Sequence, residues 1–249
     1  MKPGGGRTGR VWWSFLLVAI IAMPSLGTAP AMAQAAGQEQ VIAKIDAAVK
    51  ARNEGIAGYT VTEHYTVYRN GDQSHAAAEM TVRTTYKQES GKSYVIQSES
   101  GSEILRRVIL HSILENERQI NLPGVREGAW FTTANYRMKV KPGGVQQMDG
   151  RNCFAVEVTP RPKSQHLMQG TLWADAATGA IVHVEGKAKK NLSFVTGDVQ
   201  VMRKYTDVDG FAQATYARAE SNSFLFGRTV VTIEYRDYNI VPRTNATRP

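Results

Sequence analysis

Histidine, cysteine and carboxylate side chains are the groups in this sequence that could act in catalysis or metal binding, and they are dispersed along the chain. No two histidines stand at the i, i+4 spacing of a helical metal site, there is no Gly-x-Ser-x-Gly motif, and no glycine-rich loop is placed to cradle a phosphate. The sequence therefore predicts no catalytic residues and no metal site. The histidines are His64, His75, His111, His166 and His183.

Cys153 is the single cysteine, so the chain cannot form an internal disulfide and must be stabilised by a packed core. It lies in the strand-like run Asn-Cys-Phe-Ala-Val-Glu-Val, where a buried thiol acts as a small hydrophobic side chain. A catalytic thiol needs a helix terminus or a basic neighbour, and the flanking residues provide neither clearly. Carboxylates such as Glu157, Glu185 and Glu234 could meet across strands, although solvated strand faces account for them more simply. An exported hydrolase is the least favoured function.

The N-terminus has the organisation of a cleavable secretory signal peptide. Three cations precede an apolar run, Val11–Met23, which is shorter than the ~20 residues that a membrane-spanning helix requires. Prolines and a glycine follow, and Ala31-Met32-Ala33 then offers small residues at the positions that a signal peptidase recognises. We predict a signal peptide over residues 1–33, with cleavage between Ala33 and Gln34. An uncleaved N-terminal anchor is the alternative.

Cleavage also changes the charge of the chain. Residues 1–33 carry three cations, Lys2, Arg7 and Arg10, and no acidic residue, so their removal lowers the net charge from +8 to +5. The remaining cations are scattered among acidic residues along strand patterns, without the basic and aromatic clustering of a nucleic-acid module. We therefore expect the mature chain to bind no nucleic acid and not to span a membrane.

Two helices are predicted. In the first, over Glu39–Asn53, apolar residues recur on a single helix face. The second lies at about Gly101–Gln119, with Ser100 and Glu103 at the two positions of a capping box. Its apolar residues cover so broad an arc that we expect it to be buried on more than one side, against a curved sheet. These residues are Ile104, Leu105, Val108, Ile109, Leu110, Ile113 and Leu114.

Elsewhere, apolar and polar residues alternate with the period of two that is typical of antiparallel strands with one wet face. Asn70-Gly71, Gly143-Gly144 and Asp149-Gly150 mark turns. The first three strands are expected near Tyr59–Val67, Glu79–Lys87 and Tyr94–Ser98. The later ones are expected at Trp130–Lys141, Asn152–Val158, Leu167–Asp175, Ala180–Lys187, Gly197–Tyr205, Phe211–Ser221 and Arg228–Asn239.

These elements predict a mainly β (α+β) fold. We expect one antiparallel, strongly curved sheet or incomplete β-barrel of about ten strands, with the N-terminal and central helices packed on its concave face. The expected organisation is a signal peptide over residues 1–33, one domain over residues 34–240 and a disordered tail over residues 241–249.

Large side chains dominate the predicted inward face of the sheet, and a curled sheet of this size encloses more space than small side chains fill. Such folds bind apolar ligands in the concave face, and methionine and aromatic residues can repack around acyl chains. A solid, fully packed core is the alternative. The candidate ligand-binding residues are Tyr65, Met80, Val82, Tyr86, Tyr94, Ile96, Leu105, Ile109, Trp130, Tyr136, Met138, Phe154 and Leu172.

Three runs of the sequence resemble the LolA-like periplasmic lipoprotein-carrier superfamily, which includes sensors of the RseB and MucB type. Val41–Tyr59 is similar to the family's opening helix and first strand, and Gly170–Gly186 to its hairpin with an Asp-x-x-Thr-Gly turn. Phe226–Tyr238 is similar to the closing strand of related exported proteins. The resemblance extends over most of residues 39–240, and it implies an incomplete barrel that holds lipid acyl groups without a cofactor.

The resemblance and the export signal together imply a non-catalytic periplasmic binding protein whose partner is a lipid or lipoprotein acyl chain. The alternative is an RseB-like envelope sensor or scaffold that binds another envelope protein. In the carriers, one arginine of the barrel is tied to the movement of a lid. Arg69, Arg83, Arg137 and Arg203 all lie in predicted strands, and the sequence does not choose among them.

Overall fold

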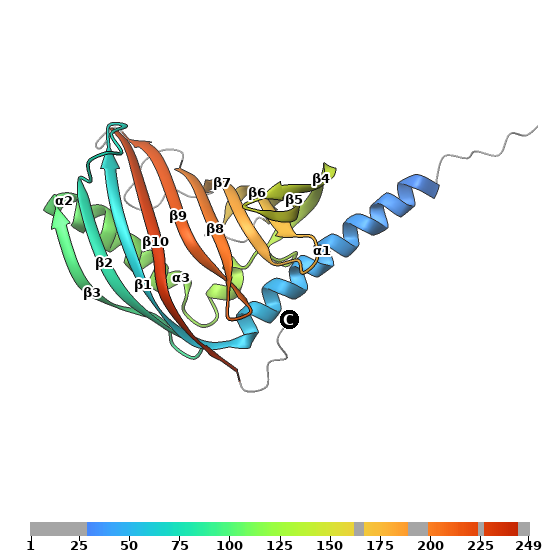
Figure 1. The fold of residues 1–249 in the computed structure, drawn as a ribbon, viewed down its shortest axis with the longest axis horizontal. Helices are drawn as coiled ribbons and strands as arrows, with labels where there is room; N and C mark the ends of the chain where they lie inside the picture. The colour runs from blue at the N-terminus through green and yellow to red at the C-terminus, as the bar shows by residue number, and fades with distance from the viewer. Residues whose placement is uncertain (1–28, 162–166, 189–198, 224–226, 244–249) are drawn as a thin grey trace, which may run out of the picture.

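The computed structural model describes residues 29–161, 167–188, 199–223 and 227–243. Its ten strands form one antiparallel sheet in the order β3-β2-β1-β10-β9-β8-β7-β6-β5-β4, which confirms the predicted sheet (Figure 1). The strands are β1 (Ile56–Arg69), β2 (Ala78–Lys87), β3 (Gly91–Gly101), β4 (Tyr136–Met148), β5 (Arg151–Pro160), β6 (Met168–Asp175), β7 (Ile181–Ala188), β8 (Val199–Val208), β9 (Phe211–Ser223) and β10 (Gly227–Pro242).

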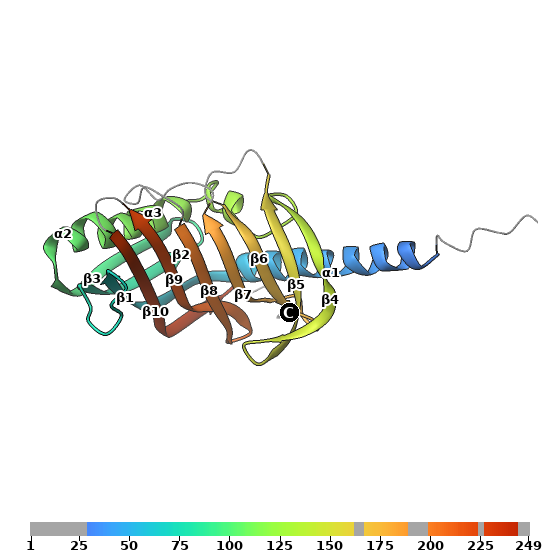
Figure 2. The same cartoon turned by 90° about the horizontal axis from the view of Figure 1, so that it is seen from above.

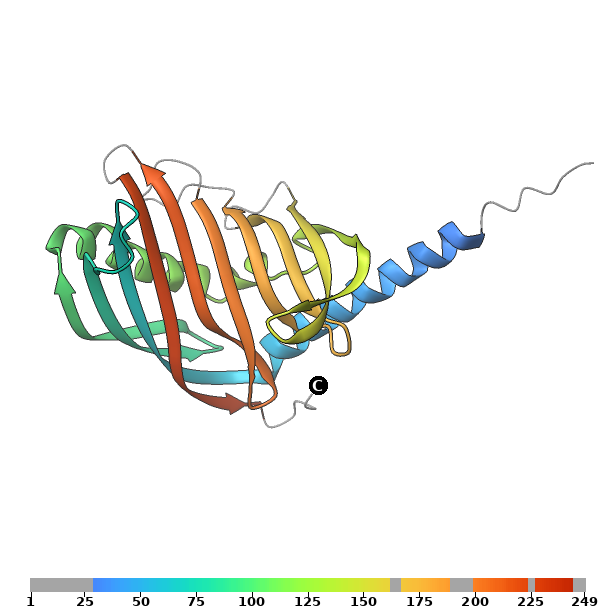
Figure 3. The same cartoon turned by 45° about the horizontal axis from the view of Figure 1, so that its top comes forward.

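The sheet is open, with β3 and β4 at its two edges, and it curves around the helices (Figure 3). Its two halves are joined by a pairing that is distant in sequence. β1 lies antiparallel to β10, with a register that runs from Ile56 opposite Pro242 to Arg69 opposite Thr229. Every other pair of neighbouring strands in this sheet is also consecutive in the chain, so the β1–β10 pair is what joins the two halves into one layer.

Both helices lie on the same side of the sheet (Figure 2). The first helix, α1, extends over Ala29–Gly55, ten residues further toward the N-terminus than the predicted start at Glu39. The alanine-rich sequence before Glu39 has high helix propensity, and this accounts for the longer helix. The expected cleavage point between Ala33 and Gln34 falls within α1, whereas most of the expected signal peptide, residues 1–28, lies outside the described residues.

The central helix consists of α2 (Glu103–Leu105), a π-helical segment (Arg106–Leu110) and α3 (His111–Ile120). Its N-cap is Ser102, whose side chain accepts a hydrogen bond from the backbone N–H of Leu105 at 3.5 Å. The predicted capping box was therefore wrong by two residues. Ser100 still belongs to β3, and its hydroxyl donates to Glu79 of β2 at 3.3 Å.

The interior contains two main apolar clusters. In the first, the central helix packs against β1, β2, β9 and β10, and its Ile109 is fully buried against Met80 and Val82. In the second, α1 packs against β4 to β7, with Ile45 of α1 buried against Leu172. A smaller third cluster around Tyr86 and Phe211 closes one end of the sheet. The apolar burial that stabilises the fold therefore occurs mainly in two places, under the central helix and under α1.

Two details of β4 differ from the sequence prediction. The strand begins at Tyr136 rather than at Trp130, because residues 130–135 form turns in which the Thr132 carbonyl accepts the N–H groups of Asn135 and Tyr136. Gly143 and Gly144 have φ of 114° and 66°, but they form an irregularity within β4 and not a turn between strands. Glycine tolerates these angles without steric cost.

The C-terminal strand also extends further than predicted. Val241 and Pro242 pair with Gly58 and Ile56 as the end of β10, so the expected tail over residues 241–249 does not begin at Val241. Residues 244–249 lie outside the described residues. Asp149-Gly150, by contrast, forms the predicted turn between β4 and β5.

Candidate functional site

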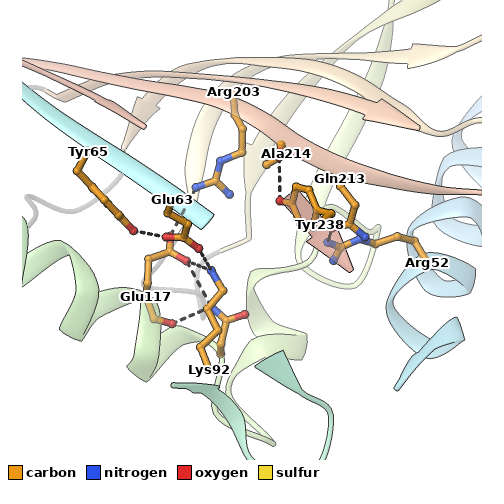
Figure 4. A network of polar contacts seen from close by, with 10 residues as sticks. Arg52, Glu63, Tyr65, Lys92, Glu117, Arg203, Gln213, Ala214 and Tyr238 are labelled. Carbon is orange, nitrogen blue, oxygen red and sulfur yellow. Dashed lines mark hydrogen bonds and ion pairs between the residues drawn. The ribbon is translucent and has the colours of Figure 1, made fainter. Parts of the chain in front are cut away.

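Four charged side chains from four different elements meet on the concave side of the sheet (Figure 4). They are Glu63 of β1, Lys92 of β3, Glu117 of α3 and Arg203 of β8. We call them the charged cluster. Because each element contributes one residue, the cluster forms only when the central helix lies on the folded sheet.

Lys92 is the central cation of this cluster. Its Nζ donates a 2.8 Å hydrogen bond to Glu117 Oε2 and lies 4.0 Å from Glu63 Oε1. The other oxygen of Glu63 accepts a short hydrogen bond from the Tyr65 hydroxyl. Arg203 approaches the cluster from β8, with its guanidinium 3.5 Å from Glu117 Oε1. One ammonium thus serves two carboxylates, and Glu63 Oε1 lacks a hydrogen-bond donor.

The environment of the cluster fixes its protonation states. Burial alone would raise the pKa of Glu117, but the charges of Lys92 and Arg203 outweigh it and lower that pKa from 4.5 to about 2. Burial opposes the charge of Lys92, but the carboxylate of Glu117 and its neighbours raise the Lys92 pKa well above its usual range. Burial, followed by the negative charge of Glu63, raises the pKa of Tyr65.

These shifts bear on what the cluster can do chemically. General acid–base catalysis is most efficient when the pKa of the acting group lies near the working pH. The pKa values of Glu117 and Lys92 are displaced in opposite directions away from neutrality, so this pair stays ionised and holds its protons firmly. An ion pair of this kind is suited to holding elements together or to binding a charged group.

Arg203 differs from its partners in exposure. It lies on the inner face of β8, where it pairs with Val184 of β7 and Ala217 of β9, both of which belong to the apolar clusters. Its side chain is 40% exposed, whereas that of Lys92 is 12% exposed and that of Glu63 only 3%. The inner wall is therefore open to solvent at the boundary between the two clusters.

A second polar group lies on the same side of the sheet, toward α1 (Figure 4). Arg52 of α1 donates to Gln213 Oε1 at 2.8 Å and to the Ala212 carbonyl at 3.2 Å. Tyr238 of β10 donates to the Ala214 carbonyl at 2.8 Å. The two Arg52 bonds tie the C-terminal end of α1 to β9, and the Tyr238 bond joins β10 to β9. Gln213 is only 1% exposed, and Arg52 satisfies its amide oxygen, whereas its amide nitrogen has no hydrogen-bond partner.

The structure separates the predicted ligand-binding residues into groups. Six are core members of the first cluster or pack against it at its edge, and a seventh, Ile96, lies on edge strand β3 with 36% exposure. The others belong to the second cluster or pack against it, except Tyr86, which lies in the third. The first group is Tyr65, Met80, Val82, Leu105 and Ile109, with Tyr94 at its edge; the second is Tyr136 and Leu172, with Trp130, Met138 and Phe154 at its edge.

The first cluster is tightly filled at these residues. Tyr65 and Val82 are 0% exposed, Met80 and Ile109 are 1% exposed, and Leu105 is 3% exposed. A cavity of about 340 Å³ lies elsewhere, between α1 and the β6–β7 turn, and Val41, Ile45 and Phe154 contribute to its lining. An acyl chain could reach the inner face under the central helix only by taking the place of side chains that now fill it.

Cys153 and His183 lie in environments that are typical of structural residues. Cys153 is 0% exposed, and burial raises the pKa of its thiol, as expected for a small hydrophobic side chain. His183 lies between Asp149 and Glu185, with both ring nitrogens 2.8 Å from a carboxylate oxygen, and its ring is edge-on to Trp173. Among the described residues, no group of three or more His, Cys, Asp or Glu side chains could hold a metal ion.

Comparison with known proteins gives likenesses of fold. No family model matches the sequence, and no curated protein matches it. The structure is similar to that of an outer membrane lipoprotein-sorting protein domain from Vibrio parahaemolyticus, with 15% identity, coverage of 86% of this chain and 95% of the other, and a TM-score of 0.47. None of the described helices is long and apolar enough to cross a membrane.

Two further solved structures are similar. A LolA superfamily protein from Nitrosomonas europaea is 10% identical, with coverage of 85% of this chain and 97% of the other and a TM-score of 0.45. MucB, in its complex with MucA from Pseudomonas aeruginosa, is 9% identical, with coverage of 79% and 93% and a TM-score of 0.25. At these identities the likeness concerns the arrangement of strands and helices, and it assigns no role to any residue of this chain.

Proposed function

We propose that this protein is an exported, non-catalytic binding protein that accommodates the acyl chain of a lipid or lipoprotein against the concave face of its sheet. One observation carries the proposal. The apolar inner face of β1 and β2 is covered by a single helix, and the apolar side chains of that helix, such as Ile109 and Leu110, are fully buried against it. A flexible hydrocarbon chain offers the same kind of surface as these side chains.

The central helix is a cover that can be exchanged. It packs on the sheet through apolar side chains and is not paired with any strand. Two ion pairs join it to β3: Glu117 of the helix with Lys92, and Arg106 of the helix with Glu99. Because the first cluster is filled, an acyl chain and the central helix compete for one surface. Ligand affinity then depends on how strongly the helix is held.

This competition can be tested with a matched pair of variants on the same helix. Ile109→Ala removes a side chain that is 1% exposed, and Ile104→Ala one that is 58% exposed. A buried Ile→Ala change costs about 2–5 kcal/mol, so Ile109→Ala should bind dodecyl maltoside at least about tenfold more tightly in calorimetric titration. Ile104→Ala should bind as the unchanged protein does.

The following result would contradict the proposal. The mature chain, residues 34–249, carries no lipid in native mass spectrometry, and neither the mature chain nor Ile109→Ala binds any amphiphile below the micelle concentration of that amphiphile. Weaker binding by Ile109→Ala than by Ile104→Ala would contradict the competition and leave only damage to the fold as an explanation.

The proposed location is the periplasm, because of the predicted signal peptide. Expression of the full chain in a Gram-negative host should yield a periplasmic protein whose first residue is Gln34 by N-terminal sequencing. Retention of residues 1–33 on a membrane-bound product would support the uncleaved anchor instead.

A second candidate function, docking to another envelope protein, is favoured by exposed apolar residues at one end of the sheet. Val95 of edge strand β3 is 67% exposed, and Ile104 of the neighbouring central helix is 58% exposed. Val95→Asp with Ile104→Asp should abolish capture of such a partner and leave amphiphile binding intact. Equal capture by the variant would exclude this surface.

A further inference from the structure

We propose that Arg203, on the inner wall of the sheet, binds the oxyanion of an amphipathic ligand, a carboxylate or a phosphate, while the acyl chain lies on the apolar concave face. This inference rests on the proposed function and adds to it the chemistry of the ligand's polar end.

The position of Arg203 in the sheet is the first argument. On β8 it is paired with Val184 on one side and Ala217 on the other, and these residues are 2% and 7% exposed. Val184 belongs to the second apolar cluster and Ala217 to the first. A ligand whose head is held at Arg203 therefore has an apolar surface beside it for its chain, on either side of the guanidinium.

Accessibility is the second argument. Of the two cations in the charged cluster, Lys92 is 12% exposed and Arg203 is 40% exposed. The carboxylate of Glu63 is enclosed as well, at 3% exposure. A ligand that enters the concave side therefore meets Arg203 before it meets Lys92 or Glu63.

The third argument is how the charges are shared. Glu117 already accepts a 2.8 Å hydrogen bond from Lys92, whereas its distance to Arg203 is 3.5 Å. Charge-assisted N–H···O bonds are usually 2.7–2.9 Å long, so the Arg203 contact is the weaker of the two. The Tyr205 side chain is a second polar neighbour of the Arg203 guanidinium. A guanidinium has five N–H donors, and two neighbours do not use them all.

The chemistry of the guanidinium selects the ligand class. Its planar fork pairs with carboxylate or phosphate oxygens through two parallel hydrogen bonds, and apolar surroundings strengthen such a contact. The two carboxylates of the cluster repel an arriving anion, but Lys92 and Arg203 balance them, so the four charges sum to zero. The oxyanion therefore approaches a cluster with no net charge, and it contacts Arg203, the cation with the longer distance to Glu117.

The test uses three ligands with the same dodecyl chain: dodecanoate, dodecyl phosphate and neutral dodecyl maltoside, each below its micelle concentration. Calorimetric titration of the mature chain should give affinities for the two anionic ligands about tenfold or more above that for the maltoside. Arg203→Gln should lose this preference and keep its affinity for the maltoside. The relative strength of carboxylate and phosphate then identifies which oxyanion the site prefers.

Arg83→Gln is the matched control. Arg83 lies on the convex face of β2, where it donates to the hydroxyls of Thr60 and Thr62, so its loss should leave the preference unchanged. Arg203→Lys keeps the positive charge but loses the planar guanidinium, so it should retain part of the preference for anionic ligands. It also provides a second test of the site if Arg203→Gln does not fold.

The outcomes separate this inference from the proposed function. Equal affinity for all three ligands, or a preference that survives in a folded Arg203→Gln, overturns the oxyanion site and leaves acyl binding standing. Failure of all three ligands to bind overturns both.

Discussion

Lys92 of β3 donates a 2.8 Å hydrogen bond to Glu117 of α3 and so joins an edge strand to the helix that covers the sheet. The pair is largely enclosed, since the two side chains are 12% and 23% exposed. Removal of one partner from such a pair leaves the other charge uncompensated in a poorly solvated place, which costs more than the pair itself contributes.

Lys92→Met should therefore destabilise the protein by about 3 kcal/mol or more, because Glu117 and Glu63 are both left without their ammonium partner. Urea unfolding followed by tryptophan fluorescence measures the change. In Lys92→Met with Glu117→Met, much of the lost stability should return. Additive losses in the double variant would mean that the two residues are not coupled.

The same pair gives the protein a specific acid sensitivity. The Glu117 pKa is lowered from 4.5 to about 2 in the folded state, so the carboxylate contributes stability above its unfolded pKa that is lost as the pH falls through the folded value. About 3 kcal/mol of unfolding free energy should disappear between pH 4.5 and pH 2. In Glu117→Gln this part of the pH dependence should be missing, and an unchanged slope would refute the assignment.

The N-cap of the central helix offers a comparison between two nearby serines. Ser102→Ala removes the acceptor for the Leu105 N–H and should cost about 0.5–1 kcal/mol. Ser100→Ala removes only an exposed hydroxyl bond to Glu79, and its effect should be smaller. Thermal unfolding of the two variants decides between the observed cap and the capping box expected from the sequence; a larger loss in Ser100→Ala would favour the latter.

Gly170 of β6 faces Gly186 of β7 at a very close approach. A Cβ at Gly170 would collide with the Glu185 carbonyl oxygen and lie 2.6 Å from Gly186 Cα. Gly170→Ala should therefore destabilise the protein by at least about 1–3 kcal/mol through forced backbone movement. Gly128→Ala, where nothing lies within 4 Å, should be neutral within about 0.5 kcal/mol. Similar melting temperatures for the two variants would rule out the close approach.

Most of the sheet was predictable because the alternation of apolar and polar residues in the sequence matches the alternation of buried and exposed side chains along the strands. Met80, Val82 and Tyr86 alternate with polar residues, and in the structure they face the interior while Arg83 faces outward. Strand ends were less predictable. The expected strand at Trp130 is replaced by turns, and Asp46 of α1 helps to hold them by accepting a hydrogen bond from the Thr133 N–H at 2.9 Å. That contact joins residues 87 positions apart, so no local pattern encodes it.

The charged cluster was not predicted, although one signal was present. Glu63 lies between Val61 and Tyr65 in the inward set of β1, so a strict alternation places a carboxylate inside the sheet. Its partners could not be inferred, because Lys92, Glu117 and Arg203 each resemble an ordinary surface charge in the sequence. Only the pairing of distant strands and the position of the central helix bring them together.

The pairing of β1 with β10 also determines the order in which the fold can be completed. Among the described strands β1 is the first and β10 the last, yet they are adjacent at the join between the two halves of the sheet. Strands β1 to β3 can form a meander early, and β4 to β9 can form another, but neither can dock until β10 has been made. Contacts between such distant segments are slow to form. The exposed edges of the two half-sheets can pair with other chains until β10 joins them, so aggregation is most favoured before this last pairing forms.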